Sequence, residues 1–86
     1  MAVSATLRDR ILGKLDDGGL PRKGPNKMFA GYGRGHRCAA CDRTITPYEI
    51  EYEMDFDRRV THRMHRDCAV MWQAACERRA SLHPSA

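Results

Sequence analysis

Residues 38–41, Cys-Ala-Ala-Cys, and residues 65–68, His-Arg-Asp-Cys, are the stretches of this sequence that decide its fold. Each holds two side chains that can bind a metal, with two residues between them, and this spacing is typical of one tetrahedral zinc site. The 23 residues that separate the two stretches are enough for a β-hairpin. Four protein ligands leave no open position on the ion, so one structural Zn²⁺ is expected. The predicted ligands are Cys38, Cys41, His65 and Cys68.

The length of the chain explains why a metal is needed. It has 86 residues, and the first 35 are rich in glycine and proline and contain no cysteine. A core built mainly from the remaining residues is marginal without a metal or a disulfide. Structural zinc contributes roughly 10–16 kcal/mol of apparent binding free energy at neutral pH, which is comparable to the stability of a whole domain.

The start of the sequence favours a cytoplasmic location. Residues 1–6 lack the basic start and the apolar run of a secretory signal, and no stretch approaches transmembrane length. In a reducing compartment, paired cysteines bind metal more often than they form disulfides. A c-type haem site is excluded because Asp42, not a histidine, follows the first Cys-x-x-Cys pair.

Positive charge is concentrated in the N-terminal part of the chain. Residues 1–35 carry seven Lys or Arg and three Asp or Glu, whereas residues 36–86 carry eight of each kind. Three thiolates and one Zn²⁺ would make the C-terminal part more negative by about one charge. The formal net charge of +4 therefore belongs to the N-terminal arm.

Residues 6–16 have the pattern of a short amphipathic helix. Leu7, Ile11 and Leu15 recur every four residues and lie on one stripe, and Thr6 provides a start that resembles a capping box. A helix this short is unstable alone in water, so it must dock on the zinc module, dock on a partner or fray. Of these alternatives, we expect it to dock on the rest of the chain.

Residues 20–35 are predicted to be a loop. Glycine and proline recur throughout this stretch and disfavour regular structure. Its four basic residues are not accompanied by any acidic residue, and Phe29 and Tyr32 lie among them. Such a segment has the composition of a binding surface for phosphates and bases.

Residues 48–56 show the clearest periodicity, because apolar and acidic residues alternate. This pattern predicts a strand with one buried face and one acidic, solvent-facing side. The apolar residues are Tyr48, Ile50, Tyr52, Met54 and Phe56, and the acidic ones are Glu49, Glu51, Glu53 and Asp55. A turn at residues 57–59 and a return strand at residues 60–64 complete a hairpin. The predicted register pairs Phe56 with Val60, Met54 with His62, Tyr52 with Met64 and Glu53 with Arg63.

A helix is predicted over residues 66–79, after the hairpin. One face of this helix collects Cys68, Met71, Trp72, Ala75 and Cys76. Met71 and Trp72 are expected in the core. Cys76 lies two helical turns beyond Cys68, about 12 Å along the axis, and is too far away to share the metal.

Two other histidines compete for the fourth ligand position. His62 precedes His65 by three residues, and the predicted register places it on the inner face of the hairpin, so it could replace His65. His36, two residues before Cys38, is the weaker competitor. A histidine at the end of a strand is more often packed or hydrogen-bonded than bound to a metal.

The predicted order of knuckle, hairpin and helix resembles a treble-clef zinc finger. The C-x2-C…H-x2-C spacing also resembles the first zinc module of a LIM domain, although the second LIM module is missing, so LIM partner specificity does not carry over. The whole chain resembles a group of small, uncharacterised bacterial zinc-binding proteins, which join an N-terminal helix, a Leu-Pro-Arg turn (residues 20–22 here), a glycine-rich run and this finger. These resemblances imply zinc binding.

The expected fold class is therefore α+β, a small zinc-stabilised treble-clef finger preceded by a helix and a basic loop. The predicted segments are an amphipathic helix in residues 1–19, a basic Gly/Pro-rich loop in 20–36, the zinc finger module in 37–80 and a tail in 81–86.

Protein binding is the function that the sequence favours. The N-terminal arm, the acidic strand face and a free edge of the strand at 48–56 are candidate surfaces for another protein. Nucleic-acid binding through residues 20–37 is the alternative. An enzyme is not expected, because a closed zinc site offers no position for substrate and the acidic residues lie on a predicted solvent face. We further expect a monomer that does not bind membranes.

Overall fold

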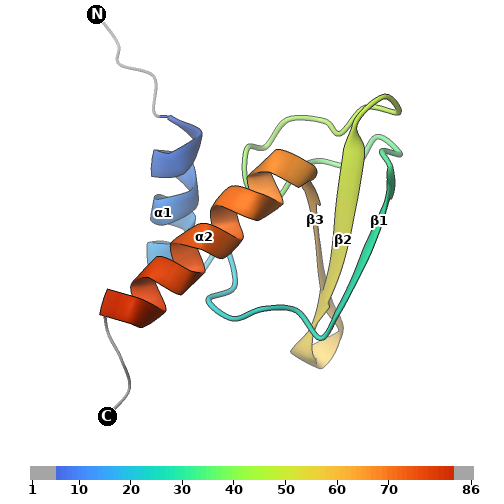
Figure 1. The fold of residues 1–86 in the computed structure, drawn as a ribbon. Coiled ribbons are helices and arrows are strands. Elements are labelled where there is room, and N and C mark those ends of the chain that lie inside the picture. Colours follow the sequence, from blue (N-terminus) through green and yellow to red (C-terminus); the bar gives the residue numbers. More distant parts are fainter. Residues whose placement is uncertain (1–5, 83–86) are drawn as a thin grey trace, which may run out of the picture.

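Two helices and a three-stranded antiparallel sheet form residues 6–82, the part of the chain that this computed structural model describes (Figure 1). The elements in chain order are α1 (Leu7–Asp17), β1 (Lys27–Tyr32), β2 (Ile50–Phe56), the short 3₁₀ turn Asp57–Arg59, β3 (Val60–His65) and α2 (Arg66–Leu82). The strand order is β1-β2-β3, and both helices lie on one side of the sheet. The α+β fold class is confirmed.

Helix α1 has the ends that its sequence predicts. The Thr6 hydroxyl accepts a hydrogen bond from the Asp9 N–H at 3.1 Å, and Gly18 ends the helix in the left-handed conformation with φ 84°. Ile11 and Leu15 are fully buried, and α1 packs against α2. The expectation that this short helix docks on the rest of the chain is confirmed.

The predicted hairpin register is confirmed at every pair. β2 and β3 pair Phe56 with Val60, Met54 with His62, Tyr52 with Met64 and Glu53 with Arg63. On the outer face of the sheet, which is the face away from the two helices, the Arg63 guanidinium lies 3.2 Å from the Glu53 carboxylate. The turn needs two successive left-handed residues, because Arg58 and Arg59 have φ values of 62° and 61°.

The prediction of a loop over residues 20–35 is wrong for β1. Lys27–Tyr32 pairs along its whole length with β2, from Lys27 opposite Asp55 to Tyr32 opposite Ile50. All six residues of β1 are exposed, so neither face carries the apolar alternation that marks a strand in a sequence. Backbone hydrogen bonds to β2 hold this strand. β1 also occupies the edge of β2 that was expected to be free.

The alternating pattern of residues 48–56 predicts burial incorrectly at two positions. Tyr48 precedes β2 and is 93% exposed, although it was expected on the buried face. Glu51 is only 6% exposed, although it was expected to face solvent. The ring of His36 lies 3.3 Å from the Glu51 carboxylate. The outer face of the sheet is therefore partly covered near residue 51.

Trp72 joins α2 to the sheet and to the segment that follows α1. Its indole N–H donates to the Pro21 carbonyl at 2.8 Å, and its ring packs edge-on against Phe56. Met71, on the same helix, is 38% exposed, so its expected place in the core is wrong. The core contains chiefly Ile11, Leu15, Leu20, Ile45, Met54, Met64 and Trp72. Within residues 6–82, neither helix has the length and apolar character needed to cross a bilayer.

Candidate metal centre

The first ligand pair lies in the knuckle, a tight turn at residues 38–42 between β1 and β2. The Cys38 N–H donates to the Arg43 carbonyl at 2.8 Å, and the Asp42 N–H donates to the Cys38 carbonyl at 3.0 Å. Asp42 adopts a left-handed conformation with φ 66°, which turns the chain back on itself. These bonds direct the thiols of Cys38 and Cys41 to the same side of the loop.

Helix α1 and strand β3 hold this knuckle from opposite sides. The Lys14 ammonium donates to the Ala39 carbonyl and to the Asp42 carboxylate, both at 2.8 Å. This hydrogen bond from Lys14 holds the pKa of Asp42 below its usual value. On the other side, the Ala39 N–H donates to the Arg63 carbonyl of β3 at 2.8 Å. The N-terminal arm is thus a structural support of the metal site.

The second ligand pair lies at the junction of β3 and α2. His65 is the last residue of β3, and Cys68 is in the first turn of α2. The N-terminus of a helix carries partial positive charge, which favours a thiolate there. The change from strand to helix at residues 65–66 brings the two side chains toward the same point although three positions separate them in the chain.

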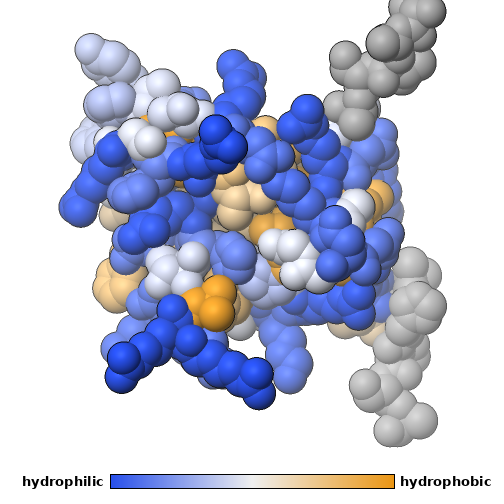
Figure 2. Space-filling model, turned by 180° about the vertical axis from the view of Figure 1, so that it is seen from behind, coloured by the Kyte–Doolittle hydropathy of each residue, from blue (hydrophilic) through white to orange (hydrophobic). Residues whose placement is uncertain are grey.

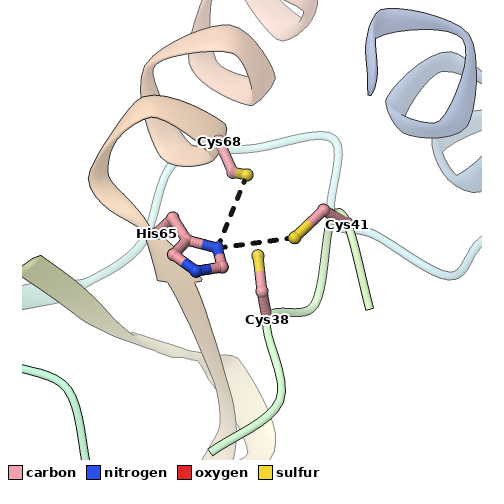
Figure 3. Close-up of side chains that lie close together, drawn as sticks. All are labelled: Cys38, Cys41, His65 and Cys68. Carbon is pink, nitrogen blue, oxygen red and sulfur yellow. Dashed lines mark hydrogen bonds between the residues drawn. The ribbon is translucent and has the colours of Figure 1, made fainter. Parts of the chain in front are cut away.

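The four predicted ligands converge on one point (Figure 3). Their ligand atoms, three Sγ atoms and one imidazole nitrogen, all lie within 4.8 Å of one another. Nδ1 of His65 is 3.4 Å from Sγ of Cys41 and 3.9 Å from Sγ of Cys68. Tetrahedral zinc with ordinary bond lengths places S and N ligands about 3.6 Å apart. This Cys₃His cluster therefore has the donor atoms and spacing to hold one metal ion.

The thiols of the cluster shift one another's pKa values. A hydrogen bond from the Cys68 thiol lowers the pKa of Cys38 to about 4, and the same bond raises the pKa of Cys68. Burial raises the pKa of Cys41. Without a metal, one thiolate is thus stabilised by protons kept on its neighbours. A bound dication would allow all three sulfurs to ionise.

Glu49 supports the histidine from outside the cluster. Its carboxylate lies 3.2 Å from Nε2 of His65 and accepts the Thr46 N–H at 2.9 Å. Burial lowers the pKa of His65, but the Cys38 thiolate and the Glu49 carboxylate together raise it above its ordinary value. A carboxylate on Nε2 fixes the ring with Nδ1 directed toward the sulfurs, which is the usual arrangement behind a metal-bound histidine.

Glu49→Ala is expected to weaken zinc binding by roughly tenfold, because His65 loses the group that orients its ring. Competition with a chromophoric chelator measures this change in affinity. Glu53→Ala is the matched control, since Glu53 pairs with Arg63 on the sheet and has no contact with the cluster. Equal zinc affinities in the two variants would contradict the role assigned to Glu49.

The competing histidines and the fourth cysteine lie outside the cluster. The ring of His62 packs edge-on against Phe56, with centroids 5.5 Å apart, and burial lowers its pKa. His36 contacts Glu51 instead. Cys76 is half-buried beside Pro21, in the Trp72 contact region. The alternative in which His62 replaces His65 therefore finds no support in the structure.

Glu49 is exposed, as the alternation predicts, but nothing in that alternation indicates its contact with His65. The Thr-x-x-Glu spacing of Thr46 and Glu49 is the sequence signal that could have indicated the position of this carboxylate. The Glu49 N–H donates to the Thr46 carbonyl, and the Glu49 side chain accepts the Thr46 N–H. The second of these bonds is the one that the glutamate makes in a capping box. This turn holds the carboxylate near the end of β3.

An open cavity of about 580 Å³ lies over one side of the cluster, where Cys41, His65 and Cys68 contribute to its wall. Arg10 and Arg43 also line it. Four protein donors occupy every position of a tetrahedral ion, so a water molecule or substrate in this cavity would have to displace a ligand to reach it.

Comparison of the chain with protein-family models, curated proteins and solved structures finds no match.

Proposed function

We propose that this protein is a treble-clef module in which one structural Zn²⁺ fixes the fold and the exposed surface binds another protein. The support for zinc is the donor set, since three thiolates and one imidazole are ligands that zinc prefers and their ligand atoms all lie within 4.8 Å of one another. The knuckle, β3 and the start of α2 supply the ligands in the order of a treble clef. A closed coordination sphere favours a structural role for the ion.

The observation that carries the binding role is the exposure of apolar side chains on β1. Met28, Phe29 and Tyr32 are all more than half exposed, and the fold uses none of them as core. The surface seen from the side opposite to Figure 1 is mostly hydrophilic, with hydrophobic residues in small separate patches (Figure 2). Exposed aromatic and methionine side chains within a polar surround are typical of protein interfaces.

The alternative of nucleic-acid binding through residues 20–37 has weaker support. Phe29 pairs with Glu53 and Tyr32 pairs with Ile50, so the two rings lie on opposite faces of the sheet and do not form one stacking platform. The face that carries Phe29 also carries acidic residues of β2, which repel phosphates. Arg22 uses its guanidinium to bond the carbonyls of Leu15 and Asp16.

A pull-down with the zinc-loaded chain from native lysate tests the binding role. We expect a stoichiometric protein partner whose recovery falls at least about tenfold in the Tyr32→Ser variant, as it does when an aromatic interface anchor is lost. Tyr48→Ser is the matched control, because Tyr48 is equally aromatic, more exposed and outside β1. Deleting residues 1–35 is unsuitable, because α1 supplies core residues.

The same preparation distinguishes the two functions by fluorescence anisotropy with short single-stranded DNA and RNA. Protein binding predicts weak, non-stoichiometric association at low salt. Recovery of no stoichiometric protein, together with tight oligonucleotide binding that weakens steeply with salt, would overturn the proposed function in favour of the nucleic-acid alternative.

A further inference from the structure

We propose that the free edge of β1 and the apolar groove between β1 and α2 bind one extended peptide segment. This segment carries apolar residues at alternate positions and acidic residues at its flanks. The inference rests on the proposed function and names the surface and the class of partner for it.

The edge of β1 offers unpaired backbone groups. β1 pairs with β2 on one side, and no other segment of residues 6–82 pairs with its outer side. The Gly33 N–H donates to the Glu49 carbonyl at 2.9 Å. This bond shows which alternate residues of β1 have backbone groups directed toward β2. Antiparallel alternation then directs the backbone groups of Met28, Ala30 and Tyr32 away from β2.

Natural proteins usually protect such an edge with proline, a bulge or inward-pointing charge. Residues 28–32, Met-Phe-Ala-Gly-Tyr, contain no proline and no charged side chain, and they pair with β2 in continuous register. An edge of this kind is a template for an added strand. Main-chain hydrogen bonds would supply affinity that does not depend on the partner's side chains.

A groove beside this edge would receive the side chains of an added strand. It has a volume of about 290 Å³ and lies between Met28, Tyr52 and Met54 of the sheet and Val70 and Trp72 of α2. A strand added to β1 continues the sheet, so every second side chain points to the face that α2 covers. Apolar residues at alternate positions of the partner therefore fit this groove, and the intervening residues point to the outer face.

Three basic residues around β1 favour a partner with acidic residues on both sides of its apolar stretch. Lys27 begins β1, Lys23 precedes it and Arg34 follows it, and none of the three has an ion-pair partner among residues 6–82. Residues 20–35 contain no acidic residue. Acidic residues on both sides of the apolar stretch would complement these cations. A second copy of this chain on the same edge would bring its own basic residues against them, which argues against self-association.

Selection from a library of random decapeptides displayed on phage tests the proposal with the zinc-loaded full chain. We expect enriched peptides to have alternating apolar residues and acidic flanks. The most enriched peptide is then synthesised, and its affinity is measured by fluorescence anisotropy. Ala30→Pro is expected to weaken binding at least about tenfold, because it removes an outward N–H and leaves a peptide carbonyl without a donor.

The fold should tolerate this proline, since proline is accepted where an edge-strand N–H faces solvent. Zinc content and the ¹H–¹⁵N spectrum check that it does. Ala30→Val is the matched control, and it is expected to bind the peptide as the parent chain does. Reversing the charges of Lys23, Lys27 and Arg34 to Glu should weaken binding and reverse its salt dependence, because salt would then screen a repulsion. Arg58→Glu, in the hairpin turn, should do neither.

The outcomes separate this inference from the proposed function. A lysate partner that Ala30→Pro still recovers in full leaves the proposed function standing and overturns the edge-strand inference. Absence of enriched peptides, equal peptide binding by the Pro and Val variants, or dimerisation of the chain through β1 in light scattering also overturns it. Loss of both the lysate partner and the peptide in Ala30→Pro supports it.

Discussion

Removal of the metal from the purified chain is expected to abolish its tertiary structure. The four ligands come from the knuckle, from the end of β3 and from the start of α2, so one ion joins three segments of the chain. The apolar core is small. Structural zinc contributes roughly 10–16 kcal/mol at neutral pH, whereas a typical domain has only about 5–15 kcal/mol of net stability. The fold therefore cannot be expected to survive without the ion.

A ¹H–¹⁵N spectrum recorded before and after chelation measures this effect. We expect the dispersed resonances to collapse on chelation and to return when zinc is added back, with one zinc per chain by metal analysis. Acid should have the same effect as the chelator, because the ligand sulfurs must be deprotonated to bind zinc.

Cysteine substitutions provide the matched comparison. Cys38→Ser removes a fully buried ligand and is expected to leave the chain unfolded at ordinary zinc concentrations. Cys76→Ser changes the same atom outside the cluster, where the thiol makes only a weak contact with the Pro21 carbonyl at 3.6 Å, and it should cost about 1 kcal/mol. Metal-free material that unfolds cooperatively, or cysteines joined in stable disulfides, would contradict the structural role of zinc.

The parts of this fold that the sequence predicts are those with local signals. Two Cys/His pairs with two-residue spacing identify the ligands, because the knuckle and the first helical turn each bring such a pair together within a few residues. The hairpin register follows from alternation, since a shift of one residue would move Val60 out of its pairing with Phe56. The helix at residues 7–17 follows from its cap and its apolar stripe.

The parts that the sequence does not predict depend on contacts between distant segments. β1 is held by backbone bonds to β2, which any sequence can make, and its side chains are exposed on both faces. Glu51 is buried and contacts His36, 15 residues earlier in the chain. Glu49 reaches His65 across 16 residues of chain. None of these contacts leaves a periodic pattern in the residues that make it.

Gly33→Ala is expected to destabilise the protein by about 3 kcal/mol, the upper range for overpacking a buried site. Gly33 is buried where the chain leaves β1, and a Cβ atom there would collide with the Thr46 carbonyl oxygen and lie 2.7 Å from the Ile45 carbonyl oxygen. Both atoms belong to backbone, which cannot move aside as the end of a side chain can.

The segment that would have to move is tied to the metal site. The Gly33 N–H bonds the Glu49 carbonyl, and Glu49 in turn orients His65. Displacing residues 45–46 would therefore loosen the Thr46–Glu49 turn and its hydrogen bond to the histidine. We expect Gly33→Ala to lower zinc affinity as well as stability.

Gly31→Ala is the matched control, because the same methyl group at that position of β1 meets no atom within 4 Å. Its effect should stay within about 0.5 kcal/mol, as for an ordinary surface substitution. Urea unfolding at a fixed free zinc concentration measures both variants, since the bound metal otherwise shifts the apparent stability. Equal midpoints for the two variants would show that residues 33 and 45–46 are not in the close contact on which the support of the metal site depends.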